Sequence, residues 1–288
     1  MTLDNNTKNL LLRFQRNEIT EYYVYTRLSR LSQGDNKDVI KKIADDEKRH
    51  YQMLYGYTQI VVKPSRWLIF KYTMLSRIFG LTFAIKLMEK GEEMAQATYE
   101  RVKDSAPPIK VLLADEHRHE KDLVDMIEEE RLNYLGSVVL GLNDALVELT
   151  GALAGLSFAL QNTKLIALAG LITGIAASFS MAASEYLSTK SEGNKNSLKS
   201  ALYTGLAYLA TVLFLIFPFL LLADYRGALG WTLINAIAVI AVFTYFSAVT
   251  KERSFKKLFS EMFVISMGVA VFSFGISVVL KMAFNIEV

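Results

Sequence analysis

The chain of 288 residues contains no cysteine, only three histidines and only four prolines. The absence of cysteine excludes disulfides, iron–sulfur clusters and a Cys₄ iron centre, and it leaves the redox compartment open. Charge is scarce in the second part, where the 157 residues after Arg131 hold 10 basic and 8 acidic side chains, against 22 and 21 before that point. The net charge of +3 therefore averages two unlike parts. No basic stripe with interleaved aromatic residues occurs, so we expect no nucleic-acid partner.

This contrast predicts an all-α protein with two domains, a charged soluble domain over 1–131 and an apolar membrane domain over 132–288. The soluble domain carries four long helical patterns. Gly34 and Asp35 separate the first pair, and Pro107 and Pro108 separate the second pair, because such residues interrupt helices. The predicted helices cover residues 5–33, 36–61, 80–105 and 108–132.

The histidines are concentrated in two short stretches, and two of them complete the motif Glu-x-x-His. A further glutamate precedes each motif, with a tyrosine seven residues after it. Residues i and i+3 share one face of a helix, so each motif directs an oxygen and a nitrogen ligand toward one point. A glutamate from each of two helices plus Glu-x-x-His from two others is the ligand set of ferritin-like di-iron bundles. We therefore predict a ferritin-like four-helix bundle with a two-metal site formed by Glu18, Glu47, His50, Glu92, Glu116 and His119.

The donor atoms of this predicted site are carboxylates and imidazoles, which suit iron or manganese better than the thiolate-rich sites of structural zinc. A single Glu-x-x-His motif occurs by chance on many solvated helix faces. Two copies, each with a partner glutamate, favour a metal site. Whether one chain or two chains form the bundle stays open at this point.

The segment 64–79 between the two helix pairs is rich in large apolar residues. One interpretation is the crossover connection that joins the two hairpins of such a bundle. The other is an interfacial helix that touches a bilayer, with Arg66, Lys71 and Arg77 at the lipid headgroups.

Five apolar segments follow, each about long enough to span a hydrocarbon core: 135–160, 164–188, 201–223, 228–250 and 260–284. Basic residues follow the second and the fourth segment, whereas the opposite connections carry only Lys164 and Arg226. The positive-inside rule places the basic connections in the cytoplasm. We expect a multi-pass protein of the cell membrane whose N-terminal domain is cytoplasmic.

Two acidic residues, Asp144 and Glu148, lie four positions apart on one face of the first span. Ionisable side chains are costly inside a bilayer, so they are functional candidates by default, although they could simply pair with polar groups across helices. The second span runs back and brings Met181 to a similar depth as Asp144, with Glu185 nearer the cytoplasmic surface. Carboxylate and thioether together could pass a divalent transition ion. Glycines spaced four apart in these spans predict closely packed helices or a dimer face.

The sequence GLNDALVE at 141–148 and the sequence SMAASEYLS at 180–188 resemble the vacuolar iron transporter family. The first 131 residues resemble the rubrerythrin branch of ferritin-like proteins. Together the two parts resemble the membrane-bound ferritin type over nearly the whole chain. This resemblance implies an exporter of iron(II) or manganese(II), driven by proton exchange and working as a homodimer of five-span subunits. It also implies that Asp144 and Met181 line the translocation path.

The chain departs from these families in two features. Members with a glutamate-rich helical insert carry it between the second and third spans, but only residues 188–200 connect them here, so the bundle would take over metal capture. Rubrerythrins often have a carboxylate three residues after the ligand that corresponds to Glu92, where this chain has Ala95. This departure and the absent Cys₄ centre argue against rubrerythrin-like peroxidase cycling.

The sequence thus predicts that the soluble site binds iron(II), or alternatively manganese(II), and passes it to Glu185, Met181 and Asp144. Protonation of Asp144 and Glu148 would release the ion outward and carry protons inward. The rival interpretation is a membrane-anchored ferroxidase, in which iron oxidation is the reaction and the spans are an anchor. A third is a sensor, in which the bundle gates transport without handing ions on.

Overall fold

A computed structural model describes residues 5–99, 134–193 and 196–284, with side chains from residue 7 and without those of 92–99 and 284. Every regular element in these ranges is an α-helix. The chain divides into two compact units, Met1–Glu129 and Glu130–Val288. Each unit is described by itself.

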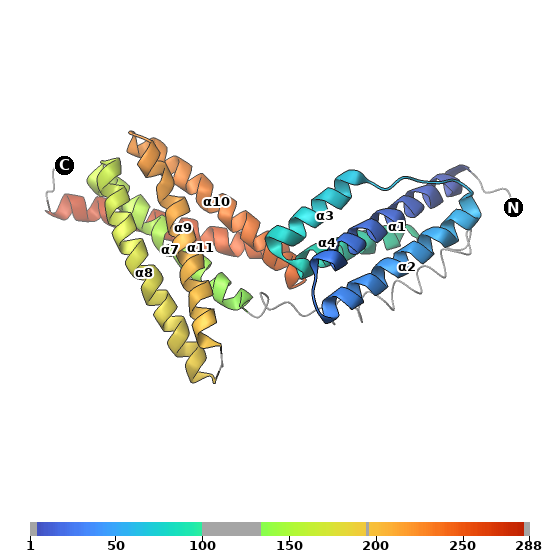
Figure 1. The fold of residues 1–288 in the computed structure, drawn as a ribbon. Helices are drawn as coiled ribbons and strands as arrows, with labels where there is room; N and C mark the ends of the chain where they lie inside the picture. The colour runs from blue at the N-terminus through green and yellow to red at the C-terminus, as the bar shows by residue number, and fades with distance from the viewer. Residues whose placement is uncertain (1–4, 100–133, 194–195, 285–288) are drawn as a thin grey trace. The chain divides into compact units, whose positions relative to one another are not determined.

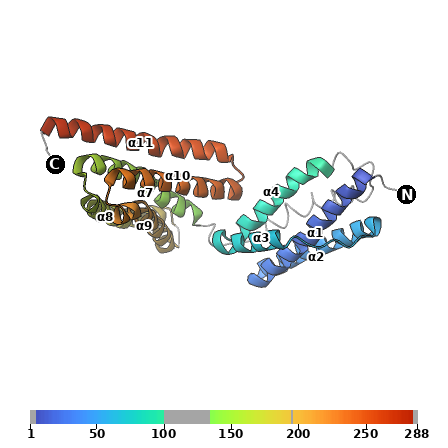
Figure 2. The ribbon, with the colours of Figure 1, turned by 90° about the horizontal axis from the view of Figure 1, so that it is seen from above.

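The N-terminal unit contains four described helices: α1 (Asn5–Leu31), α2 (Asp35–Thr58), α3 (Arg66–Phe79) and α4 (Leu81–Tyr99). Helices α1 and α2 form a hairpin and lie side by side in Figure 1 and Figure 2. Gly34 makes the turn between them with a φ of 61°, in the left-handed region that glycine adopts easily. Apolar side chains of all four helices share one core, including Val24, Ile40, Ile69 and Ile85.

Three of the four predicted bundle helices correspond to α1, α2 and α4; α1 ends at Leu31 instead of 33, and α2 ends at Thr58 instead of 61. The segment between the two predicted pairs forms α3, a regular helix. The fourth predicted helix, 108–132, lies outside the described residues. The ferritin-like four-helix bundle therefore stays a prediction.

Buried polar contacts fix how α1 lies against the end of α2. Gln15 is fully buried, and its side-chain nitrogen donates to the carbonyl of Ile60 at 2.9 Å. The Thr58 hydroxyl donates to the side-chain oxygen of Gln15 at 2.7 Å. Each buried polar group must keep its partner, so a shift of α1 along α2 would leave both unpaired. Gln15 lies one turn before Glu18, whose position it therefore fixes.

The C-terminal unit contains five helices that are long and apolar enough to cross a membrane, which confirms the predicted five apolar segments. They are α7 (Leu135–Leu160), α8 (Thr163–Ser191), α9 (Ser197–Leu221), α10 (Tyr225–Thr250) and α11 (Phe255–Phe284). Helix α8 lies beside α9, and α11 runs along α7 and α10 (Figure 2). These spans support a multi-pass membrane protein.

Small residues allow the helices of this unit to approach each other closely. A Cβ added to Gly141 on α7 would collide with the backbone carbonyl of Thr204 on α9. A Cβ at Gly174 on α8 would lie 2.5 Å from a methyl group of Val212 on α9, and one at Gly155 on α7 would lie 2.8 Å from Ser277 Oγ on α11. The predicted glycine motifs thus pack against helices of the same chain.

We expect Gly141→Ala to destabilise the membrane unit relative to Gly136→Ala, the matched control. Both positions are on α7, and both substitutions gain helix propensity, but an added methyl meets nothing within 4 Å at Gly136. Overpacking at Gly141 should lower the free energy of unfolding by about 1–3 kcal/mol against the control. Thermal unfolding of the two variants in detergent measures the difference, and equal midpoints would refute the close contact.

Candidate metal sites

The N-terminal unit holds a buried cluster of three side chains with metal-binding atoms. Glu18 comes from α1, while Glu47 and His50 come from successive turns of α2, and their exposed fractions are 2%, 6% and 1%. His50 Nδ1 lies 3.4 Å from Glu18 Oε2 and 3.6 Å from Glu47 Oε2. One potential ligand atom from each of the three residues falls within 4.8 Å of the others.

These separations suit a shared divalent cation. Two ligands that each lie about 2.0–2.2 Å from one ion are about 2.8–3.6 Å apart for octahedral or tetrahedral angles. Two carboxylates with one imidazole are ligands that iron and manganese accept. Burial also favours this interpretation, because charged carboxylates seldom lie in an interior unless they are paired or coordinate a metal.

The described residues include only part of the predicted ligand set. Of that set, the structure brings Glu18, Glu47 and His50 together. The side chain of Glu92, and the residues Glu116 and His119, lie outside the described residues. The second half of the site, and hence a pair of metal ions, stays a prediction.

The acids of the first span lie on a side of α7 that the other described residues do not fully cover. Leu140 and Glu148 are exposed there, and Asp144 between them is partly exposed. Glu148 lies 13 residues after Leu135, about 20 Å along the helix. Its carboxylate accepts a hydrogen bond of 2.6 Å from the hydroxyl of Tyr208, a fully buried residue of α9.

A second polar connection links three helices near the start of α7. The Ser137 hydroxyl donates to Glu185 on α8 at 2.6 Å, and the Thr204 hydroxyl on α9 donates to the carbonyl of Ser137 at 3.0 Å. Helices α7 and α8 run in opposite directions, so this contact sets their register. Gly141 lies four residues after Ser137 and Met181 lies four residues before Glu185, so Met181 comes level with Gly141, about one turn from Asp144.

Sequence reasoning missed three residues of this polar group: Ser137, Thr204 and Tyr208. An isolated hydroxyl in an apolar span carries no periodic signal, and its partner depends on how the helices cross. The one usable signal was a tyrosine in the middle of a span, because its hydroxyl needs a partner when it is buried. Asn143, next to Asp144, also went unnoticed. Its side-chain oxygen is buried and has no hydrogen-bond partner in the described part of the chain.

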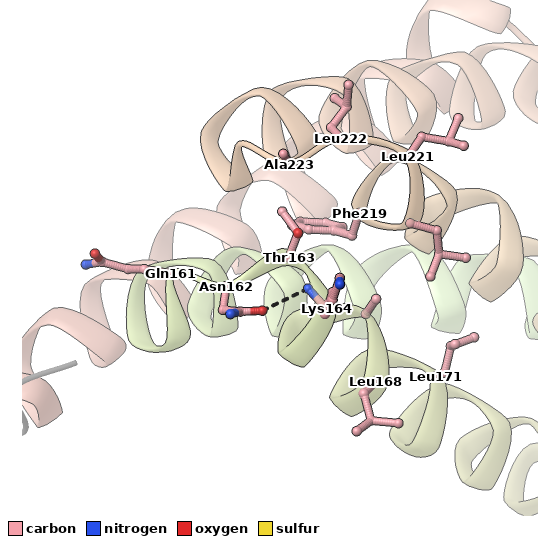
Figure 3. Close-up of a pocket in the computed structure, with 12 residues that line it drawn as sticks. Gln161, Asn162, Thr163, Lys164, Leu168, Leu171, Phe219, Leu221, Leu222 and Ala223 are labelled. Atoms are coloured by element: carbon pink, nitrogen blue, oxygen red, sulfur yellow. Dashed lines mark hydrogen bonds between the residues drawn. The ribbon is translucent and has the colours of Figure 1, made fainter.

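A separate cleft lies where α7 meets α8 and α9 ends (Figure 3). Its lining combines the polar residues of the α7–α8 connection with leucines of α8 and α9. Asn162 caps α8 there by accepting from the backbone nitrogens of Lys164 and Leu165. No carboxylate, imidazole or thioether lines this cleft, so it lacks the ligands of a metal path.

Residues 135–197 match the sequence model of the VIT family. The matched segment covers α7 and α8 and contains Asp144, Glu148, Met181 and Glu185. No curated protein matches the chain. The family match supports the vacuolar iron transporter character of the membrane part and suggests transport of metal ions such as iron or manganese.

We expect Glu47→Ala to weaken metal binding by the full-length protein, because it removes a buried ligand. Loss of a ligand should reduce the affinity of this site for Mn²⁺ by about 10–100-fold or more, given that even supporting residues of metal sites have effects of that size. Asp45→Ala, an exposed acid two positions away on α2, is the matched control and should leave binding unchanged. Anaerobic titration calorimetry with Mn²⁺ measures both, and equal isotherms for Glu47→Ala and the wild type would exclude the site.

Proposed function

We propose that this protein exports iron(II), or alternatively manganese(II), from the cytoplasm across the cell membrane in exchange for protons. The observation that carries the proposal is the pair of acids Asp144 and Glu148 deep in a span of the segment that matches the VIT family. A span that serves only as an anchor has no use for carboxylates, which are costly in lipid.

In this proposal Glu185, Met181 and Asp144 receive the ion in that order, and Asp144 and Glu148 exchange it for protons. A carboxylate can hold either a cation or a proton, so one side chain can couple the two movements. Glu185 and Glu148 already accept hydrogen bonds from Ser137 and Tyr208, which holds their oxygens in fixed positions. Met181 packs against the apolar core of the unit and offers a soft ligand suited to transition ions.

We further propose that two copies of the chain form a homodimer. The support is the exposure of Glu148 at mid-span, because a carboxylate at that depth is stable only against a water-filled path or another protein surface. A second copy that covers this side of α7 would enclose the acids.

The N-terminal unit would capture metal for export or sense its concentration. The buried cluster of Glu18, Glu47 and His50 supports metal capture. The predicted ligands Glu92, Glu116 and His119 would complete a two-metal site. The positive-inside rule supports a cytoplasmic position for this unit.

The same cluster favours a second candidate function, a membrane-anchored ferroxidase. Two carboxylates and a histidine are ligands that an iron centre would use, and bound iron would supply the redox chemistry. This candidate leaves Asp144 and Glu148 without a role, which is why we place it second.

We expect Asp144→Asn to abolish proton-coupled metal flux in proteoliposomes, because asparagine keeps the volume but cannot carry the charge that binds a cation. Met181→Ala should weaken the flux, and Glu148→Gln should have a smaller effect than Asp144→Asn. Glu192→Gln, an exposed residue at the end of α8, is the control and should transport normally. A metal-sensitive dye inside the vesicles and a pH-sensitive dye record both ions. Undiminished flux in Asp144→Asn would favour the anchor interpretation.

We also expect transport to continue without oxygen, since an exporter of divalent ions needs the reduced metal. Iron(II) flux into vesicles should be equal under anaerobic and aerated conditions at early times. A strict requirement for oxygen would favour the ferroxidase.

A further inference from the structure

Helix α3 carries a row of large apolar side chains that the other described residues leave largely exposed. Trp67, Phe70, Met74 and Ile78 follow each other at helical spacing, and their exposed fractions are 67%, 53%, 41% and 60%. The rings of Trp67 and Phe70 lie 6.1 Å apart and form a continuous apolar surface. We call these four residues the α3 stripe. Soluble surfaces seldom leave such a patch without a partner.

The opposite side of α3 already packs against its own unit. Ile69 is buried in the core that α1, α2 and α4 share. The backbone nitrogen of Ser65, the N-cap of α3, donates to Thr20 on α1 at 2.9 Å. These contacts fix the rotation of α3 about its axis. The α3 stripe therefore faces away from the core of the unit. Rotating α3 to bury the stripe would expose Ile69 and break the hydrogen bond between Ser65 and Thr20.

The charged residues of α3 are all basic. Arg66 and Arg77 stand exposed at the two ends of the helix, and Lys71 lies between them with its ammonium 5.0 Å from the ring centre of Tyr72. The helix contains no acidic residue. Large apolar residues on one side, with basic residues beside them, are typical of helices that lie in the plane of a bilayer surface.

We propose that α3 docks the N-terminal unit on the lipid surface, with the α3 stripe among the acyl chains and Arg66, Lys71 and Arg77 at anionic headgroups. A bilayer is the occupant that fits best, because the same chain carries five spans and so keeps this unit tethered to a membrane. Basic side chains near an anionic leaflet add to the attraction of an apolar stripe. Docking of α3 on lipid does not depend on the direction in which the protein transports metal.

The chain contains only two tryptophans, Trp67 in the α3 stripe and Trp231 in α10, which makes a direct test feasible. The full-length Trp231→Phe variant leaves Trp67 as the single reporter. It would be reconstituted in vesicles of phosphatidylcholine and phosphatidylglycerol that contain lipids brominated near the headgroup end of the acyl chains. We expect the brominated lipids to quench the Trp67 emission strongly relative to the same vesicles without bromine, because the side chain would lie at the acyl-chain boundary.

Charge reversal distinguishes docking on lipid from other contacts. Arg66→Glu with Arg77→Glu, added to Trp231→Phe, should abolish most of the quenching. Glutamate is favourable in the first turn of a helix, where Arg66 lies, and unfavourable in the last turn, where Arg77 lies. The two substitutions should therefore change the stability of α3 little in sum. Lys41→Glu with Lys42→Glu, two exposed residues of α2, is the matched control and should keep the quenching. The Trp67→Phe protein, in which Trp231 reports from the spans, verifies reconstitution.

Two results would overturn the proposal. If brominated lipids leave Trp67 unquenched while acrylamide reaches it, the stripe faces water. If neither reagent reaches it, protein covers the stripe, either a second copy or another part of this chain. Equal quenching in the α3 and α2 charge variants would exclude the role of the basic residues.

Discussion

The arrangement of the polar groups in the membrane unit depends on one close contact between the backbones of α7 and α9. Asp144 and Glu148 stand deep in α7, where a carboxylate in contact with hydrocarbon would be strongly unfavourable. The absence of a side chain at Gly141 lets α9 approach α7 backbone to backbone. That approach brings Thr204 to Ser137 and, further along, Tyr208 to Glu148. Ser137 in turn holds Glu185 of α8. One close helix contact thus positions the polar atoms that the proposed ion path would use.

In the N-terminal unit too, contacts between helices position carboxylates. Gln15 and Thr58 fix α1 against α2 through buried hydrogen bonds, and one turn later Glu18 meets Glu47 and His50. In both units contacts between helices hold carboxylates where a charge is costly, in the protein interior at Glu18 and Glu47 and within a span at Glu148. A divalent cation would stabilise them in each case, which is why we connect the two units in one function. The N-terminal cluster would collect the ion, and the acids of α7 would pass it on.

The features set by spacing along one helix could be predicted from the sequence, and those set by contacts between helices could not. Hydropathy located the five apolar helices, but polar residues at their ends shifted the boundaries. Helix α9 begins at Ser197 instead of 201, because the polar turn from Ser197 to Ser200 continues the helix. The Glu-x-x-His spacing identified Glu47 and His50 as one face. The contact between Tyr208 and Glu148 could not be predicted, since the two residues lie 60 positions apart in the sequence. The sequence also left two interpretations of α3, and only packing showed which of its sides faces outward.

A gradient-driven flux assay on the unmodified chain tests most directly whether the protein moves a divalent ion against protons. Proteoliposomes would be loaded with a metal-sensitive dye and given equal Mn²⁺ on both sides of the membrane, with a pH difference as the only driving force. The account predicts that Mn²⁺ accumulates on the side that is rich in protons and that the pH difference collapses faster when Mn²⁺ is present. Metal binding without accumulation, and a pH difference that decays at the same rate with and without Mn²⁺, would contradict it.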